Sequence, residues 1–332
     1  MKKYILAIIV CFFVAISCKN ETNKLEEDKP TNTQTTTSTP EANAQEDRFK
    51  FSLAQWSLHQ PFQDGSLDPM NFAQIAKDLG FSGVEYVTQL YPQLAGKEND
   101  RETIMQLAQS LLDQSEQAGV DNVLIMVDHA GELADPDPLK RKQAIQNHVY
   151  WLDAAKLMGA KAVRANLFGE LDPVKWHQYA VNSLNELGAY GQSIGVHIII
   201  ENHGGWSSDS KKLAAVLTEV DNPNVGTLPD FGNFCVKREG GERWSTPCVL
   251  EYDMYVGTKE MMPFAKGVSA KSYAFDDNGN ETKIDYPRMM QIVADAGYKG
   301  YIGVEYEGNL DDPKEGILLT KKLLEKSIQQ LR

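Results

Sequence analysis

Residues 197–205, HIIIENHGG, decide the fold of this chain. A short apolar run leads into a carboxylate, Glu201, and Asn202, His203 and two glycines follow at once. A continuous apolar run of this length is typical of a strand buried on both faces, as the strands of parallel sheets are. A carboxylate at the carboxyl end of such a strand points into the mouth where an α/β barrel carries out its chemistry. One such glutamate alone more often pairs with a neighbouring cation, so the interpretation depends on whether the pattern recurs.

Strand-like and helix-like segments alternate along the rest of the chain. Strands are predicted at residues 49–58, 83–87, 122–127, 162–166, 196–201, 225–230, 267–271 and 301–306. Helices are predicted at residues 69–79, 100–118, 137–158, 173–194, 209–220, 286–296 and 314–330. Eight strands, each but the sixth clearly followed by a helix, predict an α/β fold, a (β/α)8 TIM barrel. A doubly wound open sheet is the alternative, but the glycine-rich fingerprint expected after its first strand is missing. Residues 235–262 are expected to form an enlarged loop and a short helix.

The first residues have the composition of a targeting segment. MKKYILAIIVCFFVAISC holds two lysines and an apolar run too short to cross a bilayer comfortably, which predicts a signal peptide at residues 1–17. The small residues before Cys18 resemble a bacterial lipobox, which implies lipid attachment to the Cys18 sulfur; an ordinary secretory signal is the alternative. Residues 18–47 are nearly devoid of apolar side chains and predict a flexible tether. We therefore expect an exported protein, lipid-anchored on the periplasmic or cell-surface side of a bacterial membrane, with its folded domain at residues 48–332.

Charge and cysteine content limit the classes of partner. The formal net charge of −13 argues against nucleic acid as a partner. Only Cys235 and Cys248 remain in the predicted domain. They could pair in an exported protein, and two buried thiols are about equally compatible with the sequence.

Polar side chains lie at the carboxyl end of nearly every predicted strand. They are His59, Glu85, Asp128, His129, Arg164, Asn166, Glu201, His203, Asp230, Asn233, Lys271, Glu305 and Glu307. Any one of them is more often structural than functional, but so many at one mouth predict a binding or catalytic site. Three of them, Glu201, Asp230 and Glu305, could offer oxygen ligands to a divalent ion such as Mn²⁺, Mg²⁺, Co²⁺ or Zn²⁺. Such an ion polarises a carbonyl while a carboxylate moves a proton between adjacent carbons.

Four motifs carry a resemblance to a known family. IIIENHGG, LPDFGN, VSAKSYAFDDNGN and YIGVEYEG resemble the sugar phosphate isomerase/epimerase family, which has a xylose isomerase-like barrel. The resemblance covers about residues 50–331 and is specific to the superfamily, not to a substrate. In that family a Glu, an Asp, a His and a Glu on strands five to eight hold the metal. It therefore implies that Glu201, Asp230 and Glu305 are metal ligands, and that Glu201 and Glu305 are the acid/base pair.

The sequence departs from this family pattern at two positions. The strand-seven motif His-x-Lys-Asp is here Ser269-Ala270-Lys271-Ser272, so the histidine ligand is replaced by Ser269. The motif Asp-x-Gly-His after strand six ends instead in Asn233. Losing an imidazole weakens a transition-metal site. Three alternatives follow: His203 substitutes as a ligand, a harder ion takes oxygen and water ligands, or no metal binds and Lys271 and Arg164 stabilise charge.

Several further residues are candidates for contacts to a sugar. Trp56 is expected to form a wall of the pocket, because aromatic faces suit the apolar face of a sugar ring. His59 and His129 are predicted to contact substrate or to anchor loops through hydrogen bonds. Arg164 is expected to bind a carboxylate or a hydroxyl pair; an ion pair with a barrel glutamate such as Glu85 is the alternative. The full set predicted to bind substrate is Trp56, His59, Glu85, His129, Arg164, Asn166, His203 and Asn233.

The combined pattern predicts a sugar isomerase or epimerase that uses metal-assisted proton transfer on a sugar or keto-sugar. A lyase or hydrolase acting on a keto-glycoside is a second possibility, since the same enediolate chemistry ejects a group from the β-carbon. A non-catalytic carbohydrate-binding lipoprotein is a third, and the replaced histidine favours it. Glu201 and Glu305 argue against that third interpretation, because a binding module has little need of two carboxylates that repel each other.

Overall fold

The computed structural model describes residues 49–332. The predicted signal peptide (1–17), the predicted lipid site at Cys18 and the predicted tether (18–47) lie outside the described residues. Among residues 49–332, no helix combines the length and the apolar character that crossing a membrane requires.

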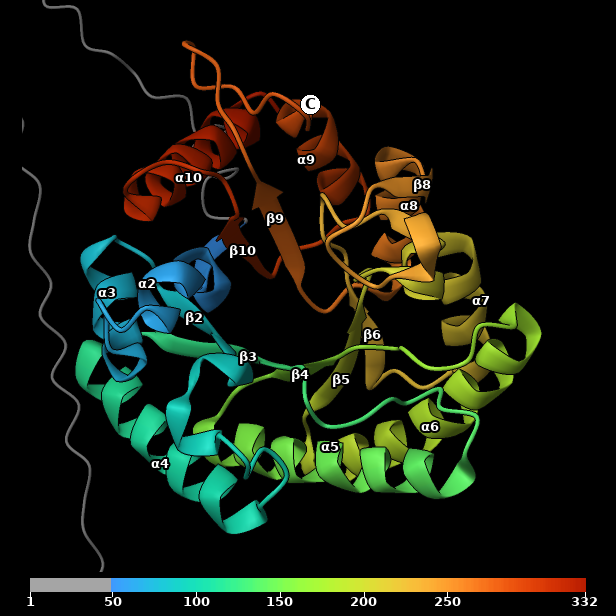
Figure 1. Ribbon diagram of the computed structural model, residues 1–332. Helices are drawn as coiled ribbons and strands as arrows, with labels where there is room; N and C mark the ends of the chain where they lie inside the picture. The colour runs from blue at the N-terminus through green and yellow to red at the C-terminus, as the bar shows by residue number, and fades with distance from the viewer. Residues whose placement is uncertain (1–48) are drawn as a thin grey trace, which may run out of the picture. The chain divides into compact units, whose positions relative to one another are not determined.

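Eight parallel strands form a closed barrel. They are β1 (Lys50–Ala54), β2 (Gly83–Val87), β3 (Asp121–Val127), β4 (Ala162–Ala165), β5 (His197–Glu201), β6 (Val225–Leu228), β9 (Val268–Ser272) and β10 (Tyr301–Tyr306). The sheet runs in the order β6-β5-β4-β3-β2-β1-β10-β9. Short irregular bridges close it between β6 and β9, where the Ser269 amide donates to the Pro229 carbonyl at 2.9 Å and the Phe231 amide donates to the Ser269 carbonyl at 3.1 Å. The strands lie in a ring with the helices outside (Figure 1), which confirms the TIM barrel and excludes the open sheet.

The outer layer consists of helices that connect the strands. They are α2 (His59–Gln63), α3 (Phe72–Asp78), α4 (Arg101–Ala118), α5 (Pro138–Met158), α6 (Pro173–Ile194), α7 (Ser210–Val220), α8 (Met254–Met261), α9 (Tyr286–Asp295) and α10 (Pro313–Gln329). Short 3-10 helices are η1 (Gln55–Leu58), η2 (Pro69–Asn71), η3 (Thr88–Leu90), η4 (Pro92–Leu94), η5 (Gly205–Ser208), η6 (Glu239–Gly241) and η7 (Met262–Phe264). An aspartate caps the start of most long helices, and a proline follows it in α5, α6 and α10. Both residues favour a helix start. The aspartate carboxylate accepts hydrogen bonds from backbone amides of the first turn, and proline has no amide N–H that would lack an acceptor there.

The three isoleucines of β5 are fully buried, as the opening sequence motif predicts. Ile198, Ile199 and Ile200 alternate between the barrel interior and the layer of helices, so both faces of the strand are covered. Burying each such side chain contributes about 1.5–3 kcal/mol. This burial holds the strand in register and places Glu201 at its end, at the mouth of the barrel.

Two predicted elements differ from the structure. The first predicted strand (49–58) is too long: β1 ends at Ala54, and the chain continues as η1 and α2. Side chains replace the backbone as hydrogen-bond acceptors here. The side-chain Oε1 of Gln55 accepts from the Val87 amide at 2.9 Å, and the Ser57 hydroxyl accepts from the Tyr306 amide at 2.9 Å. The enlarged loop at 235–262 contains an antiparallel hairpin, β7 (Cys235–Arg238) and β8 (Cys248–Glu251), before α8.

Candidate active site

A cavity of about 660 Å³ opens at the carboxyl ends of the barrel strands. The cavity is lined by these residues predicted from the sequence: Trp56, Asp128, His129, Arg164, Asn166, Glu201, His203, Asn233, Glu305 and Glu307. Lys271 and Asp230 lie just beneath its surface, where both contact lining residues. The strands therefore bring most of the predicted polar residues together at one mouth.

Three carboxylates meet on the floor of the cavity. Glu201, Asp230 and Glu305 each present an oxygen within 4.8 Å of the others, and all three side chains are buried. They come from neighbouring parts of the ring, on β5, after β6 and on β10. Asp230 is fixed by its surroundings, because its Oδ1 accepts from the amides of Gly232 (2.8 Å) and Asn233 (2.9 Å). The result is a preorganised acidic site.

Ser269 lies between two of these carboxylates. Its Oγ is 2.7 Å from Asp230 Oδ2 and 2.9 Å from Glu305 Oε2. A hydroxyl has one proton and can donate it to one carboxylate only, so the second contact requires a proton on the carboxyl partner. Burial raises the pKa of Asp230 to about 8, although Lys271 opposes the shift. Without a bound cation, Asp230 is therefore the group that carries this proton at neutral pH.

Lys271 is the cation on the β9 and β10 side of the site. Its Nζ lies 2.9 Å from Glu305 Oε1, 3.2 Å from Glu307 Oε1 and 3.7 Å from Asp230 Oδ2, and the side chain is 2% exposed. Burial lowers the pKa of this ammonium, but the attraction of the three carboxylates outweighs burial and holds the pKa well above its ordinary value. Lys271 therefore stays charged and orients Glu305.

Arg164 is the cation on the opposite side. Its Nη1 donates to Asp128 Oδ1 at 2.7 Å, and its Nε lies 3.0 Å from Glu201 Oε2. The alternative of an ion pair with a barrel glutamate is therefore confirmed, with Glu201 as the partner in place of Glu85. Burial raises the pKa of Glu201 to about 7, with Arg164 opposing that rise. Glu201 can accordingly exchange a proton near neutral pH.

Glu85 is not among the residues that line the cavity, so the structure does not support its predicted role in binding substrate. Its side chain is buried inside the barrel, where Oε1 accepts from the Ser52 hydroxyl at 2.6 Å and Oε2 has no hydrogen-bond partner. Burial raises the pKa of Glu85 to about 8, against the effect of the Ser52 hydrogen bond. The strand alternation that the sequence shows does not distinguish a carboxylate at the mouth from one deeper in the barrel.

His59 is likewise not among the residues that line the cavity. It begins α2, and its ring stacks on Trp56 with centroids 4.4 Å apart. Its Nδ1 lies 2.7 Å from the Trp56 carbonyl oxygen. These contacts support the loop-anchoring alternative for His59, and Trp56 lines the cavity.

His203 is oriented by a chain of hydrogen bonds. The Asn166 amide donates to Asp128 Oδ1 at 2.9 Å, which leaves Asn166 Oδ1 to accept from His203 Nδ1 at 2.8 Å. Burial lowers the pKa of His203 to about 4, so the ring is neutral and Nε2 keeps its lone pair. Among the described residues, the group whose ligand atoms lie close enough to share an ion contains the three carboxylates and not His203. The structure therefore does not support His203 as the replacement ligand.

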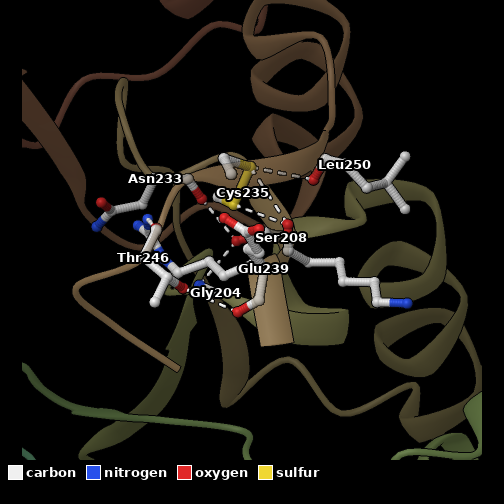
Figure 2. The surroundings of a disulfide bond; sticks show 10 residues. Gly204, Ser208, Asn233, Cys235, Glu239, Thr246 and Leu250 are labelled. Atoms are coloured by element: carbon white, nitrogen blue, oxygen red, sulfur yellow. Dashed lines mark hydrogen bonds between the residues drawn. A yellow bond between two sulfur atoms is a disulfide. The ribbon is translucent and has the colours of Figure 1, made fainter. Parts of the chain in front are cut away.

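The hairpin β7–β8 supplies lining residues that sequence reasoning missed. Cys235 and Cys248 form a disulfide with Cα atoms 5.8 Å apart, which settles the question left open by the sequence. Figure 2 shows how the base of the hairpin is held: the Ser208 hydroxyl donates to the Asn233 carbonyl at 2.6 Å and accepts from the Gly204 amide at 2.8 Å. The hairpin contributes Arg238, Arg243, Trp244 and Glu251 to the cavity. A tryptophan within the polar stretch GGERW was the available signal.

Comparisons with known proteins agree with the fold. The family model described as xylose isomerase-like TIM barrel matches residues 73–324. The C-glycoside deglycosidase alpha subunit of Arthrobacter globiformis is 32% identical over 77 residues, which is 21% of this chain and 22% of that protein. The 3'-dehydrocarminate deglycosidase alpha subunit of Microbacterium sp is 35% identical over 68 residues, 19% of this chain and 20% of that protein. The chain thus matches only about a fifth of the length of these relatives.

Two solved structures share the fold. The 3-keto-D-glucoside 4-epimerase of E. coli aligns with a TM-score of 0.61 at 13% identity, over 84% of this chain and 99% of that one. An IOLI protein with a binding zinc atom aligns with a TM-score of 0.60 at 13% identity, over 86% and 99%. At these identities the likeness establishes the fold alone. Together with the family match, it shows that this chain belongs to the xylose isomerase-like TIM barrel family.

Proposed function

We propose that this chain is an isomerase or epimerase that acts on a sugar or keto-sugar. It removes a proton from the carbon next to the carbonyl and returns a proton to the resulting enediolate. One observation carries the proposal: Glu201 and Glu305 are both buried on the floor of one cavity, and each is oriented by its own cation. In a binding module, the repulsion between two such carboxylates would destabilise the fold without serving a function. Membership of a family whose solved members include a keto-glucoside epimerase supports this chemistry.

The residues have distinct roles in this proposal. Glu201, with its pKa near neutral, takes the proton from the carbon beside the carbonyl. Glu305 returns a proton to the carbon or to the oxygen of the resulting enediolate. Arg164 and Lys271 remain cationic throughout and stabilise the negative charge that develops in the transition state. Trp56 forms the apolar wall, and His129, Asn166, His203 and Asn233 offer hydrogen bonds to sugar hydroxyls.

The acidic triad fits a divalent metal ion. All three side chains are carboxylates, so the donor set is made of oxygen atoms and suits a hard or borderline ion such as Mg²⁺ or Mn²⁺ better than one that needs an imidazole. Binding would displace the proton that Asp230 carries. When bound by Glu201, Asp230 and Glu305, the ion would polarise the substrate carbonyl. The bound zinc of the IOLI structure supports the capacity of this fold to hold a divalent ion and identifies neither the residues nor the ion in this chain.

A keto-glycoside lyase or hydrolase is the second candidate. Both curated relatives are named as deglycosidases, and the name of one specifies a 3'-dehydro substrate, 3'-dehydrocarminate. After Glu201 removes the proton beside the carbonyl, the enediolate electrons can expel the substituent on the β-carbon. The bond to the aglycone then breaks with its electron pair, and the departing group takes up a proton from solvent while the sugar keeps a new carbon–carbon double bond. The same two glutamates serve both reactions.

Hydrogen–deuterium exchange in ²H₂O tests the function directly. The protein is incubated with a panel of free and keto-sugars and with 3-keto glycosides, and NMR follows deuterium incorporation next to the carbonyl and any released aglycone. Exchange with the glycoside intact supports the epimerase, and release supports the lyase. Glu201→Gln and Glu305→Gln should abolish exchange and retain sugar binding. Glu219→Gln, which alters an exposed partner of His177 on the outer helices, is the matched control.

Metal content is measured on the same preparations. A stoichiometric divalent ion that is lost in Glu201→Ala and Asp230→Ala supports the metal-assisted reaction. The metal-assisted reaction is excluded if the protein contains no ion and added Mg²⁺, Mn²⁺, Co²⁺ or Zn²⁺ gives no thermal stabilisation. Charge stabilisation would then fall to Arg164 and Lys271. Sugar binding without exchange in the wild-type protein would instead favour the carbohydrate-binding lipoprotein.

We also propose that the chain is exported and anchored by lipid at Cys18, as the sequence predicts. Mass spectrometry of the mature N-terminus tests this. Diacylation at Cys18, lost in Cys18→Ser, is the expected result; an unmodified mature N-terminus would contradict it.

A further inference from the structure

The cavity is larger than one sugar ring requires. Its volume of about 660 Å³ is that of roughly twenty water molecules at about 30 Å³ each, against about a dozen non-hydrogen atoms in a hexose. The charged residues occupy its floor, at the ends of β5, β6, β9 and β10. A substrate whose reacting ring sits on the carboxylates therefore leaves the outer part of the cavity for another group.

The outer part has an aromatic wall, which we call the aromatic rim and define as Phe168, His203 and Trp244. The ring centroid of Trp244 lies 4.8 Å from that of His203 and 6.0 Å from that of Phe168. Arg243 covers Phe168, with its guanidinium carbon 4.1 Å from the ring centroid. His203 follows β5, which lies opposite β1 in the ring of eight strands, so the rim faces Trp56 across the mouth.

Trp244 is held in place by contacts that leave part of its surface exposed. The hairpin that carries it is closed by the disulfide, and its indole lies over Gly204, where an added Cβ would be 3.8 Å from the ring. Its side chain nevertheless remains 44% exposed. A large aromatic side chain that is positioned on the wall of a cavity and left partly open is a typical ligand contact.

One guanidinium nitrogen of each arginine beside the rim binds the protein itself. Arg243 forms an ion pair with Glu132 at 2.5 Å, and Arg238 Nη1 donates to the Thr246 carbonyl at 2.7 Å. A second sugar would need hydrogen-bond partners for its hydroxyls at this place, whereas a flat apolar ring would not. The aromatic faces of Phe168, His203 and Trp244 therefore favour a flat aromatic ring as the occupant.

We propose that the aromatic rim is an aglycone subsite, and that the substrate is a keto-glycoside with an aromatic aglycone rather than a free monosaccharide. The reacting sugar lies on the carboxylates, and the aglycone packs against Trp244 and Phe168. This inference rests on the proposed function, since it places the reacting ring at Glu201 and Glu305. Trp244 is a specificity-determining residue in it and takes no part in proton transfer.

Three 3-keto glucosides that differ only in the group at the anomeric carbon test the proposal: methyl, phenyl and glucosyl (a 3-keto disaccharide). Exchange and aglycone release are measured as kcat/KM for each. Wild-type protein should prefer the phenyl glycoside over the methyl glycoside. Trp244→Ala should lower kcat/KM for the phenyl glycoside about 10-fold and change the methyl glycoside less than about 2-fold. Trp244→Phe should recover most of the loss. Val249→Ala, an exposed apolar position on the same hairpin outside the cavity, should change neither.

Binding is measured separately, so that the subsite and the proposed function fail independently. Quenching of tryptophan fluorescence reports binding of each glycoside to wild-type protein and to Trp244→Ala. Selective binding of the phenyl glycoside, lost in Trp244→Ala, supports the subsite even if nothing turns over, and the absence of turnover then overturns the proposed function alone. Turnover with equal preference for all three glycosides, or an equal loss for all three in Trp244→Ala, overturns the subsite. Preference for the disaccharide overturns the aromatic occupant, and binding of none of the three overturns both proposals.

Discussion

Glu85 gives the sharpest test of the electrostatics inside the barrel. Burial raises the pKa of this carboxyl from 4.5 to about 8, so the folded protein holds it protonated at neutral pH while the unfolded chain ionises it. The substitution Glu85→Gln keeps the shape of the side chain and removes its titration. Because Glu85 does not line the cavity, we expect the substitution to change the pH dependence of stability and to leave catalysis nearly unaffected.

The sign and size of the effect follow from the two pKa values. Below pH 4.5 both states carry the proton, so Glu85 makes no pH-dependent contribution. Between pH 4.5 and about 8 only the folded state carries it, so the wild-type protein loses stability as the pH rises. Each pKa unit is worth about 1.4 kcal/mol, which gives a loss of up to about 5 kcal/mol at pH 8 and above. The Glu85→Gln variant does not lose stability in this way as the pH rises. Its unfolding free energy is instead lower by about 1–3 kcal/mol at every pH, because a buried amide takes the place of the unpartnered Oε2.

Denaturant unfolding of both proteins from pH 5 to pH 9 measures the effect. The difference in unfolding free energy, Glu85→Gln minus wild type, should rise with pH by several kcal/mol and level off above pH 8. The infrared carbonyl band of a protonated carboxyl at neutral pH should weaken in the variant. Stability curves that run parallel over this pH range would refute the reasoning, since they would mean that Glu85 is ionised in the folded protein.

Other predictions concern the site and its hairpin. Replacing Arg164 by Met should cost about 3–5 kcal/mol in chemical unfolding, because it leaves Asp128 and Glu201 buried without their cation; a cost below about 1 kcal/mol would contradict the ion pairs. The rate of proton exchange should rise as the pH increases through about 7, where Glu201 loses its proton, and this limb should move to higher pH in Arg164→Met because the cation lowers that pKa; a rate that is flat from pH 5 to pH 9 would exclude Glu201 as the base. The double variant Cys235→Ser/Cys248→Ser should lose up to about 3 kcal/mol, which is a drop of several degrees in the calorimetric midpoint; an unchanged midpoint would show that the disulfide constrains nothing.

Local sequence patterns were sufficient for the fold and for the part of the site that lies on strands. An apolar run such as Ile198–Ile200 can only be satisfied by covering both faces of a strand, and eight such segments alternating with helices leave a barrel as the consistent arrangement. The carboxyl ends of parallel strands share one edge, so the sequence alone predicts that Glu201, Asp230 and Glu305 lie close together, as they do in the structure. The sequence also identified Ser269 as the replacement for a histidine.

The tertiary structure decided the matters that depend on depth and on long-range packing. Strand alternation gives the direction of a side chain and not its height in the barrel, which is why Glu85 was assigned to the cavity and lies buried beside Ser52 instead. Which carboxylate Arg164 pairs with depends on distances across the barrel that no spacing encodes. The hairpin that brings Trp244 over the mouth is held by a disulfide and by hydrogen bonds from the loop after β5, so its position follows from contacts between distant segments. Residue order thus determined which groups reach the mouth, and packing determined which of them face the substrate and in which protonation state.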